Sequence, residues 1–190
     1  MTVEAIPLTA STLLDALAQD REAVAPADVA AAEHDSASRA LRVVLFGVAE
    51  ATYAVPEGYV SEVARVPAMT AVPRVPAWLR GVTNLRGDIV SVVDLRVFLG
   101  QDPTSLHTGR LVVVRLPNED FSMGLLVDRV DLIASVPRDA VRLPVSPVEG
   151  ALAPFLTGVC QVGERLVTVI DLDRLLRSAD IRQFETQLTT

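Results

Sequence analysis

Few side chains in this 190-residue chain could carry chemistry. The sequence contains no lysine, two histidines (His34 and His107) and one cysteine, Cys160. Without lysine, a Schiff base, a lysine general base and a Walker-type phosphate loop are all excluded. A structural zinc site needs four nitrogen or sulfur ligands, and these three candidates are too few and lie far apart in the sequence. An enzyme would therefore have to use carboxylates alone.

The acidic residues do not form an evident catalytic pattern. An enzyme that uses only carboxylates needs a pair of them with a raised pKa, in a cleft that holds substrate. Asp94 and Asp171 instead directly precede short predicted helices at 95–99 and 172–177, where they are placed to accept backbone N–H bonds as caps. Cys160 is expected to be a small buried hydrophobic residue of a strand. We therefore expect no catalytic residue, no metal and no cofactor.

Composition and charge narrow the possible fold classes and binding partners further. Half of the residues are hydrophobic, and valine recurs in short runs bounded by glycine and proline, which favours strands over helices. Residues 1–38 hold seven acidic residues and one arginine, so most of the net charge of −7 lies there. The nearly neutral remainder argues against nucleic acid. With no signal peptide, no apolar run that could span a bilayer and a single cysteine, we expect a soluble cytoplasmic protein without membrane insertion.

Two halves of the chain show the same order of elements. In the first half, strands are predicted at 41–48, 52–55, 59–66, 79–85 and 89–93, with a proline-bearing loop before the last two. In the second half, strands are predicted at 110–116, 121–127, 129–136, 156–162 and 165–170, again with a proline-bearing loop before the last two. Three strands, a loop and a hairpin therefore occur twice.

A shift of 77 residues aligns the two hairpins without a gap. It carries GVTNLRGDIVSVVDL, which begins at Gly81, onto GVCQVGERLVTVIDL, which begins at Gly158. Strands such as 89–93 are apolar on both faces, which requires that both faces be covered. The repeat therefore predicts two homologous small barrels that cover one another.

The two ends of the chain are predicted to lie outside the repeat. We expect residues 1–38 to be an acidic, alanine-rich mobile tail, with a docking helix as the alternative, because three leucines between 13 and 17 share a face. Residues 39–178 form the predicted domain. Residues 179–190 are expected to be a tail or a short helix.

Three phrases of the sequence together resemble the CheW-like domain. PAWLRGVTNLRGDIVSVVDLR begins at Pro76, MGLLVDRV at Met123 and LTGVCQVGERLVTVIDLDRLL at Leu156. The resemblance runs from about Leu41 to Arg177. It implies two five-stranded SH3-like barrels packed across a shared hydrophobic core. With the elements predicted above, the expected fold is mainly β, with short helices and a flexible N-terminal tail.

The resemblance also implies a function without catalysis. Members of the family are adaptors that couple the cytoplasmic tip of a chemoreceptor to the regulatory domain of a CheA-type histidine kinase. They act in chemotaxis or in type IV pilus or gliding motility, in the cytoplasm and recruited to membrane-associated arrays. The alternatives are a paralogous scaffold with a different protein partner, a carboxylate enzyme, and a small-barrel module for nucleic acid or peptides.

Four residues are candidates for partner binding because of the resemblance and of their local setting. Arg86 lies in a predicted turn, where its fork of donors suits carboxylates on a partner helix, although it could also be a solvated turn arginine. Asn84 is expected to help hold the turn backbone. Val60 and Glu62 share one face of a strand, which suits a recognition strip, or equally an ordinary half-buried strand.

Four further candidates have a strong structural alternative. Gly81, Gly124 and Gly158 align with family glycines at which substitution is associated with lost coupling. Glycine inside a strand also marks a bulge or a close backbone approach, so their role could be purely structural. Trp78 could be an exposed interface anchor, or it could cover the edge of a core.

Overall fold

The computed structural model describes residues 40–143 and 151–183, so the predicted tail at 1–38 lies outside the described residues. The described strands are β1 (Ala40–Val48), β2 (Ala51–Pro56), β3 (Val60–Arg65), β4 (Leu79–Leu85), β5 (Asp88–Asp94), β6 (Arg110–Arg115), β7 (Ser122–Val127), β8 (Arg129–Pro137), β9 (Leu156–Val162) and β10 (Arg165–Ile170). The helices are η1 (Glu57–Tyr59), α3 (Leu95–Phe98), η2 (Arg138–Ala140), η3 (Ala153–Phe155), α4 (Leu172–Leu176) and α5 (Ala179–Arg182). Every strand predicted from the sequence is present within one residue of its predicted ends.

The strands form two five-stranded sheets of equivalent order. One sheet, barrel I, has the order β8-β1-β2-β10-β9, and the other, barrel II, has the order β3-β6-β7-β5-β4. Neighbouring strands are antiparallel except for one parallel pair in each, β2 with β10 and β5 with β7. The mainly β architecture with two related five-stranded units is confirmed.

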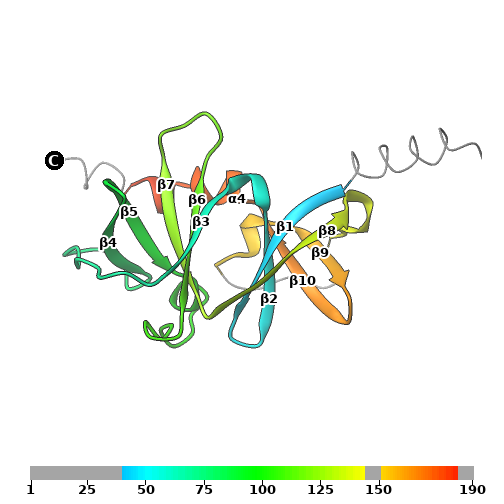
Figure 1. Ribbon diagram of the computed structural model, residues 1–190, viewed down its shortest axis with the longest axis horizontal. Helices are drawn as coiled ribbons and strands as arrows, with labels where there is room; N and C mark the ends of the chain where they lie inside the picture. Colours follow the sequence, from blue (N-terminus) through cyan, green and yellow to red (C-terminus); the bar gives the residue numbers. More distant parts are fainter. Residues whose placement is uncertain (1–39, 144–150, 184–190) are drawn as a thin grey trace, which may run out of the picture. The chain divides into compact units, whose positions relative to one another are not determined.

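The two barrels do not correspond to the two halves of the sequence. β1 and β2 from the first half lie with β8, β9 and β10 from the second, while β6 and β7 lie with β3, β4 and β5. Figure 1 shows this exchange in colour, since the cyan β2 stands beside the orange β10. Each half of the chain thus gives its first two strands to one barrel and its last three to the other. Hydrophobic periodicity shows which faces of a strand are covered but not which strand lies beside it.

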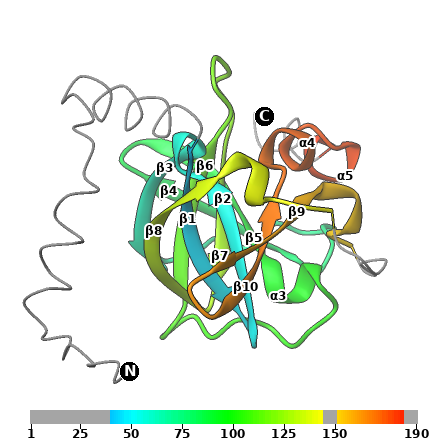
Figure 2. The same ribbon diagram turned by 90° about the vertical axis from the view of Figure 1, so that its right-hand side faces the viewer.

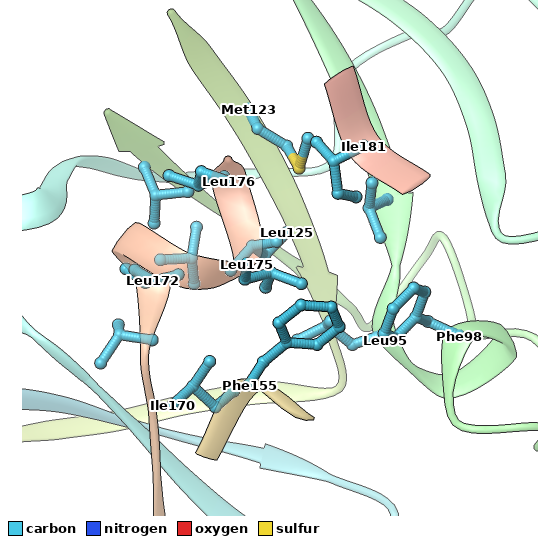
Figure 3. Packing of buried hydrophobic residues seen from close by; sticks show 14 of the residues in the cluster. Leu95, Phe98, Met123, Leu125, Phe155, Ile170, Leu172, Leu175, Leu176 and Ile181 are labelled. Carbon is cyan, nitrogen blue, oxygen red and sulfur yellow. The ribbon is translucent and has the colours of Figure 1, made fainter. Parts of the chain in front are cut away.

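The core consists of three clusters of buried side chains. A small cluster belongs to barrel I alone, and another belongs to barrel II alone. The largest joins residues of both barrels with the short helices, and Figure 3 shows part of it, where Phe98, Phe155 and Leu175 meet. In β1, Val43 belongs to the cluster of barrel I and Val44 to the shared one. The strand is apolar on both faces because each face packs on a different cluster.

Both barrels are closed in the same way at one edge. After β3, Thr70 pairs with Val82 of β4 through two backbone hydrogen bonds of 2.8 and 2.9 Å. After β8, Arg142 pairs with Val159 of β9 through bonds of 2.9 and 2.7 Å. Figure 2 looks onto barrel I, with β8, β1 and β2 side by side. In each barrel the connecting loop therefore covers a strand edge that would otherwise be unpaired.

The predicted helix caps are confirmed. The Asp94 carboxylate accepts a hydrogen bond from the Arg96 backbone N–H at the start of α3, at 3.1 Å. The Asp171 carboxylate accepts one from the Arg174 N–H in α4, at 3.0 Å. Each hairpin is therefore followed by a capped helix whose apolar side packs on the shared cluster.

Candidate protein-binding groove

The turn of hairpin β4–β5 places Arg86 at its tip. Leu85 pairs with Asp88, so Arg86 and Gly87 are the two turn residues, with φ values of 56° and 103°. Two consecutive positive φ values are the signature of the tight turn that matches the twist of a β-hairpin. The Asn84 side-chain oxygen accepts the Gly87 N–H at 2.9 Å and so holds the turn, as the sequence predicts.

Two of the predicted binding residues, Arg86 and Glu62, are brought together. The Arg86 guanidinium lies 3.3 Å from the Glu62 carboxylate on β3, the far edge strand of barrel II. The arginine side chain is 81% exposed and the glutamate side chain 29%. Exposed ion pairs of this kind stabilise a fold by about 1 kcal/mol or less. A carboxylate of a partner could therefore replace Glu62 at little cost.

A groove with an apolar floor lies beside this ion pair. Its lining combines five apolar residues with three polar ones and draws on both barrels: Val44, Glu57, Val60, Ser61, Glu62, Val63, Val130 and Ile133. Val63 and Ile133 are large hydrophobic residues that remain exposed to solvent. They lie on β3 and β8, which are edge strands of their two sheets. An exposed apolar strip with a polar rim is typical of a protein-binding site.

Val60 and Glu62 both line this groove, but their surroundings differ from a regular strand. The register of β3 against β6 shifts between the two residues. Val60 is half-buried and packs against the shared core cluster, while Glu62 faces Arg86. Val60 thus belongs partly to the core and partly to the floor of the groove.

Gly81 and Gly158 lie where the closing segments approach the hairpins. A Cβ atom on Gly81 would stand 2.2 Å from the Thr70 carbonyl oxygen, and one on Gly158 would stand 2.6 Å from that of Arg142. Gly81 also has a φ of 137°, which only glycine adopts readily. Both glycines are buried, so the geometry gives each a structural task at a barrel seam.

Gly124 and Trp78 also lie within the fold. A Cβ atom on Gly124, in the centre of β7, would come 2.7 Å from a methyl group of Leu111. Trp78 is half-buried, packs against the shared cluster and meets the Phe98 ring edge-on at 5.5 Å. Trp78 therefore covers the edge of a core, and neither residue lines the groove.

Asp94 does more than cap a helix. It is fully buried, and besides Arg96 its carboxylate accepts hydrogen bonds from the Thr104 hydroxyl at 2.9 Å, the Thr104 N–H at 3.1 Å and Arg80 at 3.2 Å. Arg80, Asp94 and Arg96 all belong to the first phrase quoted above. Within this phrase the guanidinium of Arg80 binds Asp94, whereas Arg96 gives Asp94 only its backbone N–H and pairs its own guanidinium with Asp128 at 3.2 Å.

Two side chains of chemically reactive types among the described residues, Cys160 and Glu119, have shifted pKa values. Within 40–143 and 151–183, no three histidine, cysteine or acidic residues are grouped as metal ligands, and no helix is long and apolar enough to cross a membrane. Burial raises the pKa of the Cys160 thiol, which keeps it protonated and unreactive. Hydrogen bonds from Arg182 and Arg177 lower the pKa of Glu119, the opposite of what a general acid needs.

Sequence reasoning missed the half of the groove that comes from barrel I. Val44, Val130 and Ile133 looked like ordinary strand residues, and Glu57 like a turn residue. No local pattern could have found them, because they become neighbours of Val60 and Glu62 only when β3 and β8 meet as edge strands.

Known proteins resemble this chain in sequence. The family model described as CheW-like domain matches residues 42–180. The chain is 37% identical to protein PilI of Pseudomonas aeruginosa over 107 residues, which is 56% of this chain and 60% of PilI. It is 31% identical to chemotaxis protein CheW of Klebsiella aerogenes over 139 residues, which is 73% of this chain and 82% of that protein.

A solved structure has the same fold. The crystal structure of the scaffolding protein TtCheW from Thermoanaerobacter tengcongensis superposes with a TM-score of 0.64 at 26% sequence identity. The match covers 74% of this chain and 90% of that one. It therefore includes both barrels rather than one of them.

Proposed function

The chain belongs to the CheW-like domain family and is a coupling adaptor of chemosensory arrays, and we propose that it links a chemoreceptor tip to a CheA-type histidine kinase without catalysis. It would do so in the cytoplasm, recruited to membrane-associated receptor arrays. The array serves chemotaxis, or type IV pilus or gliding motility.

The groove between β3 and β8 is the observation that carries the receptor part of this proposal. Its apolar floor suits the apolar face of an amphipathic helix, which docks through side chains spaced three and four residues apart. Arg86 at the rim offers a planar fork of donors to a carboxylate on that helix. The resemblance implies that the partner is the hairpin at the cytoplasmic tip of a chemoreceptor, and a helix of that hairpin could supply such a face.

The hairpin tips support the kinase part of the proposal. Ile89 on β5 and Leu166 on β10 occupy equivalent positions of the repeat, and both are large hydrophobic residues exposed to solvent. Each barrel therefore offers an apolar contact point away from the groove lining. The resemblance implies that the regulatory domain of the kinase has the same fold, so it could meet Leu166 at the β9–β10 tip while the receptor occupies the groove beside Arg86.

A binding experiment with purified proteins tests this function. The adaptor is titrated by calorimetry with the regulatory domain of a CheA-type kinase and with a chemoreceptor tip, both encoded in the same genome. We expect binding to both, and a loss of receptor affinity of more than about tenfold on Arg86→Glu (~1.4 kcal/mol) with kinase affinity unchanged.

The matched control is Arg138→Glu, the same charge reversal at an exposed arginine of η2 that does not line the groove. It should leave both affinities within about twofold of the unmodified protein. If neither partner binds the unmodified protein, the coupling role is wrong. If Arg86→Glu and Arg138→Glu behave alike, Arg86 is only a solvated turn residue.

A further inference from the structure

We propose that Arg42 is a second arginine of the partner-binding surface, so that the groove recognises an amphipathic helix carrying two acidic side chains rather than one. This proposal rests on the groove being the receptor site. It adds a residue for which the sequence predicts no role and which comes from the other barrel. Arg42 belongs to β1 of barrel I, and Arg86 belongs to the β4–β5 turn of barrel II.

The position of Arg42 directs its side chain to the groove. Arg42 and Val44 are two residues apart on β1, so their side chains leave the same face of the strand. Val44 lines the floor of the groove. The Arg42 guanidinium contacts Glu57, another lining residue, through two bonds of 2.6 and 3.0 Å. This two-point contact holds the guanidinium at the rim.

The two rim ion pairs have the same construction. In each, a glutamate that lines the groove is paired with an arginine from another strand or turn: Glu57 with Arg42, and Glu62 with Arg86. The two glutamates lie on either side of Val60 in the chain. The apolar floor of the groove is therefore accompanied by two guanidinium groups that reach it from different barrels.

Exposure shows which charge a partner would meet. The arginine side chains are 63% and 81% exposed, for Arg42 and Arg86, whereas their glutamates are 35% and 29% exposed. The positive groups thus lie outermost and the negative groups lie closer to the floor. An approaching helix meets two guanidinium forks, which suit carboxylates in bidentate contact. The partner chemistry that fits is an amphipathic helix with acidic residues beside its apolar face.

Each glutamate then has a definite task. In the free protein it neutralises and orients its arginine, and on docking the arginine can contact the carboxylate of the partner as well. Because an exposed ion pair contributes about 1 kcal/mol or less, neither internal pair prevents this exchange. Removing the glutamate charge should therefore not weaken binding of an acidic helix, whereas removing the arginine should.

The test compares Arg42→Gln with Glu57→Gln, which break the same internal ion pair from opposite sides. The probe is the purified cytoplasmic tip of a chemoreceptor encoded in the same genome, titrated by calorimetry at two salt concentrations. We expect Arg42→Gln to weaken binding at least about fivefold and to make it less salt-dependent. Glu57→Gln should bind the tip more tightly than the unmodified protein, because it removes the carboxylate that competes with the partner for Arg42.

Controls separate folding, this proposal and the function on which it rests. Kinase binding and urea unfolding of both variants should match those of the unmodified protein. Equal weakening by Arg42→Gln and Glu57→Gln would show that the ion pair merely ties β1 to η1, and would overturn the proposal. The proposal also fails if Arg86→Gln weakens binding while Arg42→Gln has no effect. If the unmodified protein does not bind the tip, the proposed function itself is wrong.

Discussion

Hairpins β4–β5 and β9–β10 are copies in sequence that present their arginines differently. In the first, the cation is the left-handed turn residue Arg86, which lies 3.3 Å from Glu62 on the edge strand β3. In the second, it is the strand residue Arg165, which lies 2.7 Å from Asp131 on the edge strand β8. The turn itself holds Gly163 and Glu164 instead. Both tips are tied to the opposite edge of their barrel by an ion pair.

The two ion pairs differ in how far their charged groups are exposed. Arg165 is 54% exposed and its partner Asp131 only 16%, whereas Arg86 is 81% exposed. Closure of the barrel can therefore be achieved with a cation on the strand. Placing the cation in the turn keeps the closure and moves the guanidinium outward, beside the groove. The first hairpin therefore presents a more exposed guanidinium than the second.

The two helix-capping aspartates differ in how many groups of the fold they bind. Asp171 in barrel I accepts the Arg174 N–H and is partly exposed, whereas the fully buried Asp94 in barrel II accepts bonds from Arg80, Arg96 and Thr104. One copy of the motif is a helix cap, and the other also fastens a loop and a neighbouring strand.

Removing the two capping carboxylates in turn should give the largest difference in the free energy of unfolding. Asp94→Ala should lower the free energy of unfolding by about 3 kcal/mol or more, because it leaves Arg80 and Thr104 without their buried acceptor. Asp171→Ala should lower it by about 1 kcal/mol, the usual value of an N-cap. Urea unfolding followed by circular dichroism measures both. Equal losses would mean that Asp94, too, is only a cap.

Gly81 and Gly158, the glycines where the closing segments approach the hairpins, allow a second comparison of the two barrels. Gly81→Ala should cost at least about 2 kcal/mol of unfolding free energy, since it combines a backbone clash with a left-handed φ. Gly158→Ala meets a lesser clash and no positive φ, so it should cost about 1 kcal/mol less. Thermal unfolding of both variants tests this order. A stable Gly81→Ala variant that fails to bind the receptor tip would instead make Gly81 a contact residue.

The smallest expected effect on stability concerns the turn arginine. Arg86→Gly removes the ion pair with Glu62 but relieves a non-glycine residue of a left-handed conformation, so unfolding free energy should change by less than about 1 kcal/mol. Receptor affinity should nevertheless fall as strongly as proposed for the charge reversal. A large loss of stability, seen in the same urea titration, would show that Arg86 serves the fold more than recognition.

Local patterns predicted much of the fold, and distant pairings were not predictable. The strands, both caps and the turn at Arg86 and Gly87 depend on residues that are neighbours in sequence, so periodicity and turn chemistry indicated them. The exchange of strands and the Arg42 to Glu57 contact join segments from different parts of the chain. Of the groove, the sequence predicted the side formed by Val60, Glu62 and Arg86 but not the side formed by β1 and β8. The mobile tail expected at 1–38 stays a prediction, since it lies outside the described residues.

The exchange of strands between the two halves has a consequence for biosynthesis. The ribosome makes β1 and β2 first, yet Thr52 of β2 pairs with Val167 of β10, one of the last strands to be synthesised. Barrel II has all its strands once β7 has left the exit tunnel, whereas barrel I must wait until β10 has left it as well. Until then β1 and β2, which are apolar on both faces, lack their partner strands and expose surface that favours aggregation.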